Sequence, residues 1–233
     1  MIKTAVFGAN GFVGKSLCSS LISTGNFQVV PVIRDNYSEF IGKHYDIVIN
    51  TASPAARFWA KNNPAKDFQE TVQKTANIFY GCTFEKFIQI STVSARCQLD
   101  TVYGRHKLAA ESICNYGNNL VVRLSSMFGE GLEKGVLIDM LKGQKIFVDG
   151  ESRYSFSSVD FVSDYIVANL TKTGVVEIGA FNSIRLMDIA EYLNTNLNFE
   201  GQLDIQEIEN PDENFPDAKE VFKYLDKIKN KYS

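Results

Sequence analysis

The sequence predicts an α/β fold, a doubly wound parallel sheet connected by crossover helices, and three observations lead to this prediction. Through the first half of the 233-residue chain, segments typical of strands alternate with segments typical of helices. The strand-like segments are short apolar runs rich in strand-forming residues. A glycine-rich turn stands between the first such run and the first helical segment.

The elements follow in order along the chain. In the first half we expect strands at residues 3–8, 27–33, 45–52, 86–92 and 120–125, and helices at 12–23, 64–80 and 103–116. After Gly129 glycines become frequent and the pattern loosens. There we expect helices at 136–142, 160–171, 186–194 and from about Pro216, and strands at 145–148, 175–179 and 203–208.

Composition excludes several classes of function. The 24 basic and 27 acidic residues form no block of like charge, which argues against nucleic acid as a partner. No apolar run approaches the roughly 18 residues of a membrane span, and the N-terminus lacks the pattern of a signal peptide, so we expect a cytoplasmic protein. Four cysteines without a C-x-x-C pair and only two histidines predict neither a metal site nor a disulfide framework.

The segment Gly8-Ala-Asn-Gly-Phe-Val-Gly14 follows the first strand and opens the first helix. Gly8 and Gly11 would let the backbone turn sharply and approach a pyrophosphate, while Gly14 would let the helix pack close to the strand. The free N–H groups at the start of the helix would bind the anion. This turn predicts a Rossmann-type dinucleotide-binding fold.

The end of the second strand should distinguish between the two nicotinamide cofactors. Arg34 and Asp35 follow that strand. A guanidinium suits the 2′-phosphate of NADP(H), whereas a carboxylate suits the ribose hydroxyls of NAD(H). We favour NADP(H) and keep NAD(H) open; a solvated charge at a strand end is the alternative for Arg34.

A tyrosine and a lysine stand four residues apart at the start of a predicted helix, Tyr103-Gly-Arg-His-Lys107. Residues at this spacing share a helix face, and we expect the lysine to lower the pKa of the tyrosine. The strand before this helix ends at Thr92, whose hydroxyl can bond the group that Tyr103 protonates. The order of glycine turn, strand-end threonine and Y-x-x-x-K predicts catalysis.

The sequence resembles the extended short-chain dehydrogenase/reductase family, in its NAD-dependent epimerase/dehydratase group that acts on nucleotide sugars. The resemblance runs from Lys3 to about Leu193. It rests on the segments GANGFVG, NTAS (50–53), ISTVS (90–94), YGRHK, VVRLSSMFG (121–129) and RYSFSSVDFVSD (153–164).

The resemblance implies a role for each matched residue. The implied catalytic residues are Thr92, Tyr103 and Lys107. The implied cofactor-binding residues are Gly8, Asn10, Gly11, Phe12, Val13, Arg34, Thr51, Ala52, Tyr103 and Lys107. The implied substrate-binding residues are Thr92, Ser126 and Arg153, and Asp160 would cap the next helix. We expect a dinucleotide-binding Rossmann domain at 1–125, and at 126–233 a mixed region that completes the sheet and forms a reduced substrate-binding lobe.

The sequence also departs from the family. About ten residues separate Thr92 from Tyr103, so a loop that usually covers the substrate is cut down. Between Arg34 and Asp46 there is little room for the usual extra strand and helix, so we expect that strand to be missing. Thr71 stands where the central helix usually has an asparagine.

The absence of certain residues narrows the set of reactions that the chain could catalyse. The 4,6-dehydratases of the family have an Asp-Glu pair directly after the catalytic threonine, where this chain has Val93 and Ser94. The epimerase-reductases use a cysteine near this segment and a later histidine, but here Ser94 stands at the cysteine position and no histidine follows His106. We therefore expect an NADPH-dependent reductase of a nucleotide-linked 4-keto-6-deoxy sugar, in the biosynthesis of surface polysaccharides or deoxysugars. The alternatives are an NAD-dependent nucleotide-sugar 4-epimerase and a non-catalytic NADP-binding regulatory protein.

The apolar residues of the last segment and of two central helices indicate how these helices pack. Val221, Tyr224, Leu225 and Ile228 share one side of the terminal helix, which predicts that it packs on its own domain. The family commonly dimerises through the helices that correspond here to 64–80 and 103–117, which carry the apolar Phe79, Leu108 and Ile113. We expect a homodimer.

Overall fold

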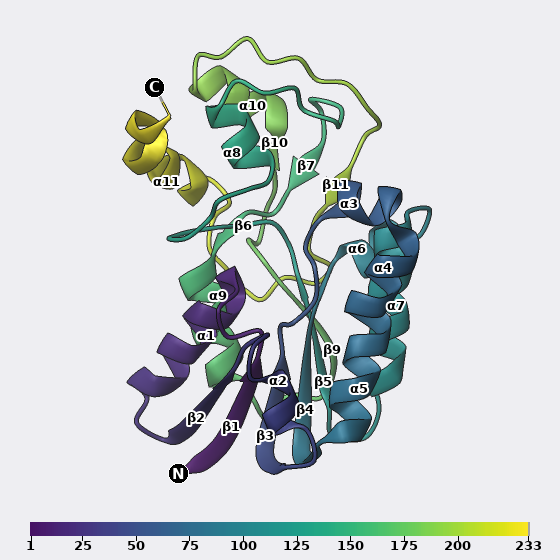
Figure 1. The fold of residues 1–233 in the computed structure, drawn as a ribbon. Helices are drawn as coiled ribbons and strands as arrows, with labels where there is room; N and C mark the ends of the chain where they lie inside the picture. The colour runs from purple at the N-terminus through teal and green to yellow at the C-terminus, as the bar shows by residue number, and fades with distance from the viewer. Residues whose placement is uncertain (233) are drawn as a thin grey trace. The chain divides into compact units, whose positions relative to one another are not determined.

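The computed structural model describes residues 1–232 and divides them into two compact units (Figure 1). The first unit holds Met1–Leu124 and Ser163–Val176; the second holds Ser125–Val162 and continues from Glu177. The expected division at residues 125/126 treats each part as continuous. In the structure, the chain returns to the first unit at 163–176 before it enters the second again.

A six-stranded sheet has the order β2-β1-β3-β4-β5-β9. The ladders that join β2 to β1, β1 to β3, β3 to β4 and β4 to β5 are all parallel. The strands are β1 (Ile2–Phe7), β2 (Phe27–Val32), β3 (His44–Asn50), β4 (Thr83–Thr92), β5 (Leu120–Leu124) and β9 (Gly174–Ile178). The doubly wound parallel sheet predicted from the sequence is confirmed.

Helices cover both faces of the sheet in the first unit (Figure 1). The helical segments here are α1 (Phe12–Ser23), α2 (Tyr37–Phe40), α3 (Arg57–Asn62), α4 (Pro64–Phe68), the π-helix η1 (Gln69–Gln73), α5 (Lys74–Gly81), α6 (Ser94–Cys97), α7 (Val102–Cys114) and part of α9 (Val159–Ala168). On one face α1 bonds to α9, where the Ser20 hydroxyl donates to Asp164 over 2.6 Å. On the other face α5 packs against α7.

One core cluster of the first unit lies between the sheet and α5. Phe7, Tyr45 and Phe87 project from three neighbouring strands and pack with Ile78 and Phe79 of α5. Each of these side chains is at most 5% exposed. Burial of an apolar side chain of this size contributes about 1.5–3 kcal/mol, so this cluster fixes α5 and the segments joined to it against the sheet.

Several elements differ from the sequence prediction. The helix expected over 64–80 is interrupted by the π-helical turn η1. The short helices α2, α3 and α6 were missed because four to six residues are too few to show a helical period. The expectation of a missing strand between Arg34 and Asp46 is confirmed: within the described residues, α2 is the one element between the end of β2 at Val32 and the start of β3 at His44, and β1 pairs directly with β3.

The second unit contains two small sheets, of order β10-β7-β11 and β6-β8. Its strands are β6 (Met127–Phe128), β7 (Arg153–Tyr154), β8 (Ser157–Ser158), β10 (Ile184–Arg185) and β11 (Ile205–Gln206). Its helices are α8 (Val136–Leu141), the start of α9, α10 (Leu186–Tyr192), α11 (Glu220–Ile228) and the short 3₁₀-helix η2 (Lys229–Lys231). The strand expected at 145–148 is wrong: only Ile146 forms a bridge, with Phe199.

The terminal helix α11 packs on the core of its own unit, as predicted. Val221 and Leu225 are fully buried there, and the Tyr224 hydroxyl donates to the Gly129 carbonyl over 3.0 Å. The helix begins at Glu220 rather than Pro216. The segment before it is held by the loop at Asn182, whose side-chain oxygen accepts from the Ala218 N–H over 2.8 Å.

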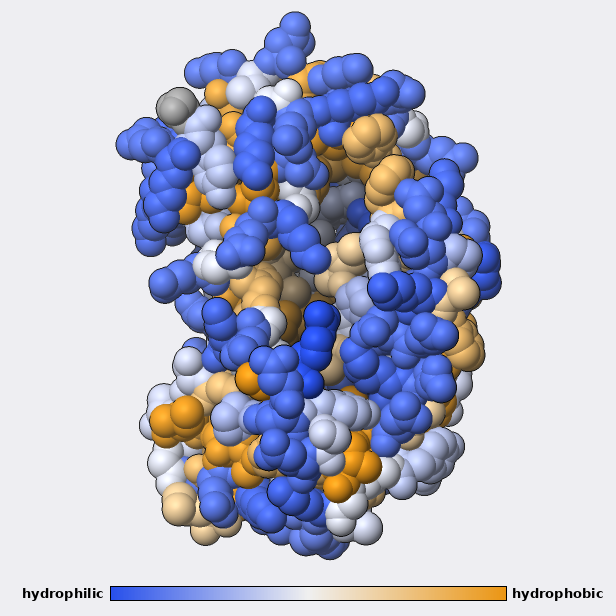
Figure 2. Space-filling model, in the orientation of Figure 1, coloured by the Kyte–Doolittle hydropathy of each residue, from blue (hydrophilic) through white to orange (hydrophobic). Residues whose placement is uncertain are grey.

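Hydrophilic side chains cover most of the face of each unit in Figure 2, with separate apolar spots among them. Among residues 1–232, no helix combines the length and the hydrophobicity that a membrane span requires.

Candidate functional site

The glycine turn adopts the conformation that the sequence predicts. Gly8 has φ +85°, a region that favours glycine, and a Cβ there would lie 2.6 Å from the Thr51 hydroxyl oxygen. A Cβ on Gly14 would lie 2.2 Å from the Gly8 carbonyl oxygen, so α1 approaches the turn more closely than any side chain allows. Gly11 has an ordinary φ of −74°.

The N-terminus of α1 is open. Gly11 occupies the N-cap position, and no side chain caps the helix. Asn10 and Gly11 are exposed, and Phe12 and Val13 are half-buried. The first N–H groups of this twelve-residue helix therefore face an uncapped end, which suits the pyrophosphate of a dinucleotide. The residues present fit the predicted cofactor.

The end of β3 is fixed beside this turn. The Thr51 hydroxyl donates to the Phe7 carbonyl over 2.8 Å, and the Ala52 N–H donates to Asn50 Oδ1 over 3.0 Å. The buried Asn50 amide donates in turn to Gln89 Oε1 over 2.9 Å. Two predicted cofactor-binding residues, Thr51 and Ala52, are thus held rigidly next to the glycine turn.

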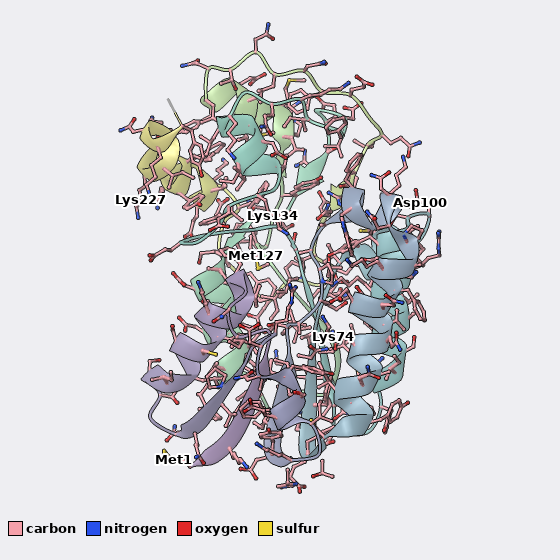
Figure 3. The ribbon with its side chains drawn as sticks, in the orientation of Figure 1. Met1, Lys74, Asp100, Met127, Lys134 and Lys227 are labelled. Atoms are coloured by element: carbon pink, nitrogen blue, oxygen red, sulfur yellow. The ribbon has the colours of Figure 1, made fainter. Side chains whose placement is uncertain are left out.

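Arg34 and Asp35 are both exposed just beyond the end of β2. Arg34 lies close enough to Glu70 of η1 to lower the pKa of that carboxyl, although the main cause is the hydrogen bond from Lys74. Lys74 begins α5 and is labelled in Figure 3. Lys66 also lowers this pKa, so Arg34, Lys66 and Lys74 form a cluster of basic residues that act on the Glu70 carboxyl.

The structure brings the three predicted catalytic residues together. Tyr103 lies in the first turn of α7, is 7% exposed, and forms a hydrogen bond with the Thr92 hydroxyl at the end of β4. Lys107, one turn later, is 4% exposed and has its Nζ 5.3 Å from the centroid of the Tyr103 ring. Its Nζ donates to the Ser53 hydroxyl over 2.6 Å.

Close packing and a buried ion pair fix α7. A Cβ on Gly104 would lie 2.1 Å from the Gln98 carbonyl oxygen. The start of α7 therefore packs directly on the backbone of the preceding turn, which also holds Asp100 (Figure 3). Further along, the Glu111 carboxylate is 2% exposed and bonds both the Arg123 guanidinium of β5, at 2.7 Å, and the Ser91 hydroxyl of β4, at 2.5 Å. These contacts set the position of α7 against the strand that carries Thr92.

Burial dominates the acid–base chemistry of the pair. It raises the pKa of Tyr103 to about 12; Asp67 also raises it, while Arg57 and the bond to Thr92 lower it. Burial lowers the pKa of Lys107 to about 8, against the nearby carboxylates of Asp67 and Glu111. The expectation that Lys107 lowers the pKa of Tyr103 is wrong for this structure, because desolvation of the phenol outweighs the other effects.

Three residues near the pair were not predicted as site residues from the sequence: Ser53, Asp67 and His106. Ser53 lies in the N-T-A-S segment, and its position after a strand end was the available signal. Asp67 of α4 is fully buried, with Oδ2 2.7 Å from Nδ1 of His106 on α7. No spacing rule joins positions 67 and 106, because the two residues meet only when α4 packs on α7.

The second unit holds the other predicted substrate-binding residues. The Ser126 hydroxyl donates to Gln206 Oε1 over 3.4 Å. The Arg153 Nε donates to the Ser183 hydroxyl over 3.0 Å and to the Glu207 carboxylate over 3.2 Å. The expected helix cap at Asp160 is wrong: the Ser158 hydroxyl accepts from the Phe161 N–H and caps α9.

The described residues contain no group of three or more His, Cys, Asp or Glu side chains that could hold a metal ion. All four cysteines are free thiols, and two of them, Cys82 and Cys114, are buried.

A family model and a curated protein each match part of this chain. Residues 4–179 match the model of the NAD dependent epimerase/dehydratase family. Over 144 residues the chain is 28% identical to UDP-2-acetamido-2,6-beta-L-arabino-hexul-4-ose reductase of Pseudomonas aeruginosa (strain ATCC 29260 / BCRC 12902 / CIP 102967 / NCIMB 11965 / PA103). The match covers 55% of this chain and 37% of that protein, so the chain spans well under half of the curated relative.

Solved structures share the fold across the chain. A UDP-galactose 4-epimerase superposes with a TM-score of 0.78 at 19% identity and covers 100% of both chains. A dTDP-4-dehydrorhamnose reductase of Clostridium acetobutylicum gives a TM-score of 0.77 at 15% identity, over 97% of this chain and 99% of that one. At such identities the likeness shows the fold alone. The family model and the glycine turn together show that this chain belongs to the NAD-dependent epimerase/dehydratase family.

Proposed function

We propose that this chain catalyses the NADPH-dependent reduction of a nucleotide-linked 4-keto-6-deoxy sugar. The observation that carries the proposal is the buried Tyr103, hydrogen-bonded to Thr92 and followed one turn later by Lys107. This constellation needs only a nicotinamide cofactor to reduce a ketone, and the uncapped helix after the glycine turn fits such a cofactor.

A nicotinamide cofactor would supply the hydride when bound, and the residues of the chain would supply the proton and hold the reactants. With hydride delivered to the carbonyl carbon, Tyr103 would transfer its phenolic proton to the carbonyl oxygen, which completes the alcohol. Because the pKa of Tyr103 is about 12, the phenol is fully protonated at neutral pH, as a proton donor must be. Thr92 supports the same oxygen, and the ammonium of Lys107 places positive charge near the developing anion.

The choice of a keto substrate has two supports. Val93 and Ser94 follow Thr92, so the pair of carboxyl groups that dehydration uses is not at those positions. The curated relative, at 28% identity, is named as a hexul-4-ose reductase. We assign Ser126 and Arg153 to the substrate: the guanidinium is suited to the substrate's pyrophosphate, and the side chain of Arg153 is 42% exposed.

The preference for NADPH rests on Arg34. Its exposed guanidinium stands at the end of β2, with Lys66 and Lys74 also close to Glu70. A phosphate on the ribose adds negative charge that this cluster would bind, and a guanidinium bonds phosphate in a forked geometry. Asp35, exposed beside it, favours the second candidate, a nucleotide-sugar 4-epimerase that retains NAD.

We further propose a cytoplasmic homodimer that forms through α5 and α7. Large apolar residues stay exposed on or beside these helices: Tyr80 is 74% exposed and Tyr116 61%. Phe79, which the sequence suggested for this surface, lies instead in the core, at 5% exposure. A dimeric mass by light scattering at micromolar concentration supports this assembly, and a monomeric mass contradicts it.

The test is a screen of NADPH oxidation against a panel of 4-keto-6-deoxy sugar nucleotides, with Tyr103→Phe as the matched control. We expect net oxidation by the wild-type protein with at least one member of the panel, and none by the variant. Conversion of a 4-hydroxy nucleotide sugar to its epimer, with NAD retained and no net oxidation, would favour the epimerase. Cofactor binding without turnover of either class would favour a non-catalytic NADP-binding regulatory protein.

A further inference from the structure

A carboxylate and an imidazole meet beside the catalytic pair. Asp67, on the short helix α4, is 0% exposed, and its Oδ2 lies 2.7 Å from Nδ1 of His106. His106 directly precedes Lys107 on α7, and its side chain is 20% exposed. The edge-to-face contact of its ring with Phe68, at 5.6 Å between centroids, holds the imidazole against α4.

Asp67 keeps one oxygen without a partner. Its Oδ1 is buried and accepts no hydrogen bond within the part of the chain that the structure describes. A carboxylate held away from water with half of its bonding capacity unused is costly. Folding alone does not require such a group at this position, because an apolar side chain would fill the same space without that cost.

Asp67 acts on both members of the catalytic pair. Its negative charge raises the pKa of Tyr103 and also that of Lys107. The elements packed against α4 are α3, η1 and α7. The titratable and charged groups on these elements and on α4 itself are Arg57, Lys61, Lys66, Glu70, Tyr103, Arg105, His106, Lys107, Glu111 and Cys114.

Two of these groups, Arg57 and Glu111, also act on the charge of Tyr103 or Lys107. Arg57 acts on Tyr103 in the opposite sense, since its positive charge favours the phenolate. Glu111 acts on Lys107 in the same sense as Asp67, but it is already paired with Arg123. Asp67 is therefore the carboxylate that reaches both the phenol and the ammonium.

We propose that Asp67, held in place by His106, is a positioning residue that puts a fixed negative charge beside the catalytic pair and so keeps the buried ammonium of Lys107 charged. The charged ammonium then stands beside the phenol when Tyr103 gives its proton to the substrate. The inference deepens the proposed function, because it rests on Tyr103 as a proton donor in reduction.

The direct test measures the titration of Lys107 without any substrate. Protein labelled with ¹³C at lysine Cε is titrated by NMR, and the Lys107 signal is assigned by its loss in Lys107→Arg. We expect the pKa of Lys107, about 8 in the wild-type protein, to fall by about one unit in Asp67→Asn. The matched control is Glu70→Gln, which removes a carboxylate from the next turn and should leave Lys107 unchanged. A Lys107 titration in Asp67→Asn equal to that of Glu70→Gln overturns the proposal.

Two variants of His106 test its part and stand in if Asp67→Asn does not fold. His106→Asn keeps an N–H donor near the position of Nδ1, whereas His106→Phe removes it. Without this donor the carboxylate loses the hydrogen bond that holds it beside α7. We expect the Lys107 pKa to fall in His106→Phe and to stay near the wild-type value in His106→Asn. Equal titrations in the two variants contradict the role of His106.

A second readout separates this proposal from the proposed function. If the protein reduces a keto sugar, loss of activity with rising pH should begin at lower pH in Asp67→Asn than in wild type. A merely structural role would change stability without moving this profile. If no keto sugar is reduced, the proposed function fails, yet the Lys107 titration still decides whether Asp67 sets the charge of the pair.

Discussion

Lys107 and Ser53 meet although 54 positions separate them: the Nζ of Lys107 donates a 2.6 Å hydrogen bond to the Ser53 hydroxyl. Ser53 follows β3, and Lys107 lies on α7, so the bond ties the catalytic helix to the end of the strand that also carries Thr51 and Ala52. This bond orients a cation that is only 4% exposed.

Removing this hydroxyl should impair catalysis. In Ser53→Ala the buried ammonium loses a bond worth about 1.5–3 kcal/mol, and Lys107 loses its fixed orientation. At 1.4 kcal/mol per tenfold change, kcat/KM should fall about ten- to a hundredfold. Ser53→Thr keeps a hydroxyl and should recover most of the activity. Steady-state kinetics of both variants measure the effect, and equal kcat/KM values for alanine and threonine would refute the orienting role.

The close approach at Gly104 predicts a loss of stability. In Gly104→Ala the new Cβ would lie 2.1 Å from the Gln98 carbonyl oxygen, and this neighbour is backbone that cannot turn aside. Such overpacking costs about 1–3 kcal/mol. Urea unfolding followed by circular dichroism should show this decrease, and the exposed Ser112→Ala on the same helix serves as the control. Equal midpoints for the two variants would contradict the packing described for α7.

Burial of Lys107 makes stability depend on pH. Below about pH 8 the ammonium is present in both the folded and unfolded protein, and its desolvation destabilises the fold. Between about pH 8 and 10.4 the folded protein has released a proton that the unfolded chain retains, so this penalty decreases as pH rises. Lys107→Met removes the penalty at every pH. Its Tm should exceed that of wild type at pH 7, and the difference should narrow by pH 10.

Tyr103 has the opposite effect at higher pH. Its pKa in the folded protein is about 12, above the ordinary value of 10, so the buried neutral phenol stabilises the fold below pH 10. That contribution is lost as pH rises from about 10 to 12, because the unfolded chain ionises first. Tyr103→Phe should therefore lose less stability than wild type over this interval in a urea series at fixed temperature. Parallel curves for the two proteins would show that the phenol is not buried as described.

Cofactor choice can be tested with two neighbouring variants. If Arg34 meets the 2′-phosphate, Arg34→Ala loses a charge-assisted hydrogen bond of roughly 1.5–3 kcal/mol. That is about one to two decades of NADPH affinity, with little change for NADH. Asp35→Ala should leave both affinities nearly unchanged. Dissociation constants by fluorescence titration give the answer, and a selective loss of NADH binding in Asp35→Ala would reverse the assignment.

The sequence predicted the fold well where long periodic segments determine it. The bounds of α1 matched at both ends, Phe12 and Ser23, because a glycine turn and a Gly25-Asn26 stop flank a clear helical period. It failed at 145–148, where an apolar run pairs only through Ile146. Short apolar runs carry no information about whether a partner strand exists.

The candidate site was predicted in part for a similar reason. Tyr103 and Lys107 share one helix, so their spacing alone placed them together. Asp67 and Ser53 reach Lys107 through tertiary packing, which no local pattern encodes. The pKa of Tyr103 was predicted in the wrong direction because spacing shows which charges are near but not how far burial excludes water.

The role of Tyr103 as proton donor can be measured by comparing wild type with Tyr103→Phe. The rate at which a 4-keto-6-deoxy sugar nucleotide oxidises NADPH and the affinity for NADPH are determined for both proteins. A positioned general acid contributes about a hundredfold to ten-thousandfold. We expect a loss of rate of at least about a hundredfold, with the NADPH dissociation constant unchanged within about twofold. A Tyr103→Phe protein that reduces the sugar at the wild-type rate would contradict this role.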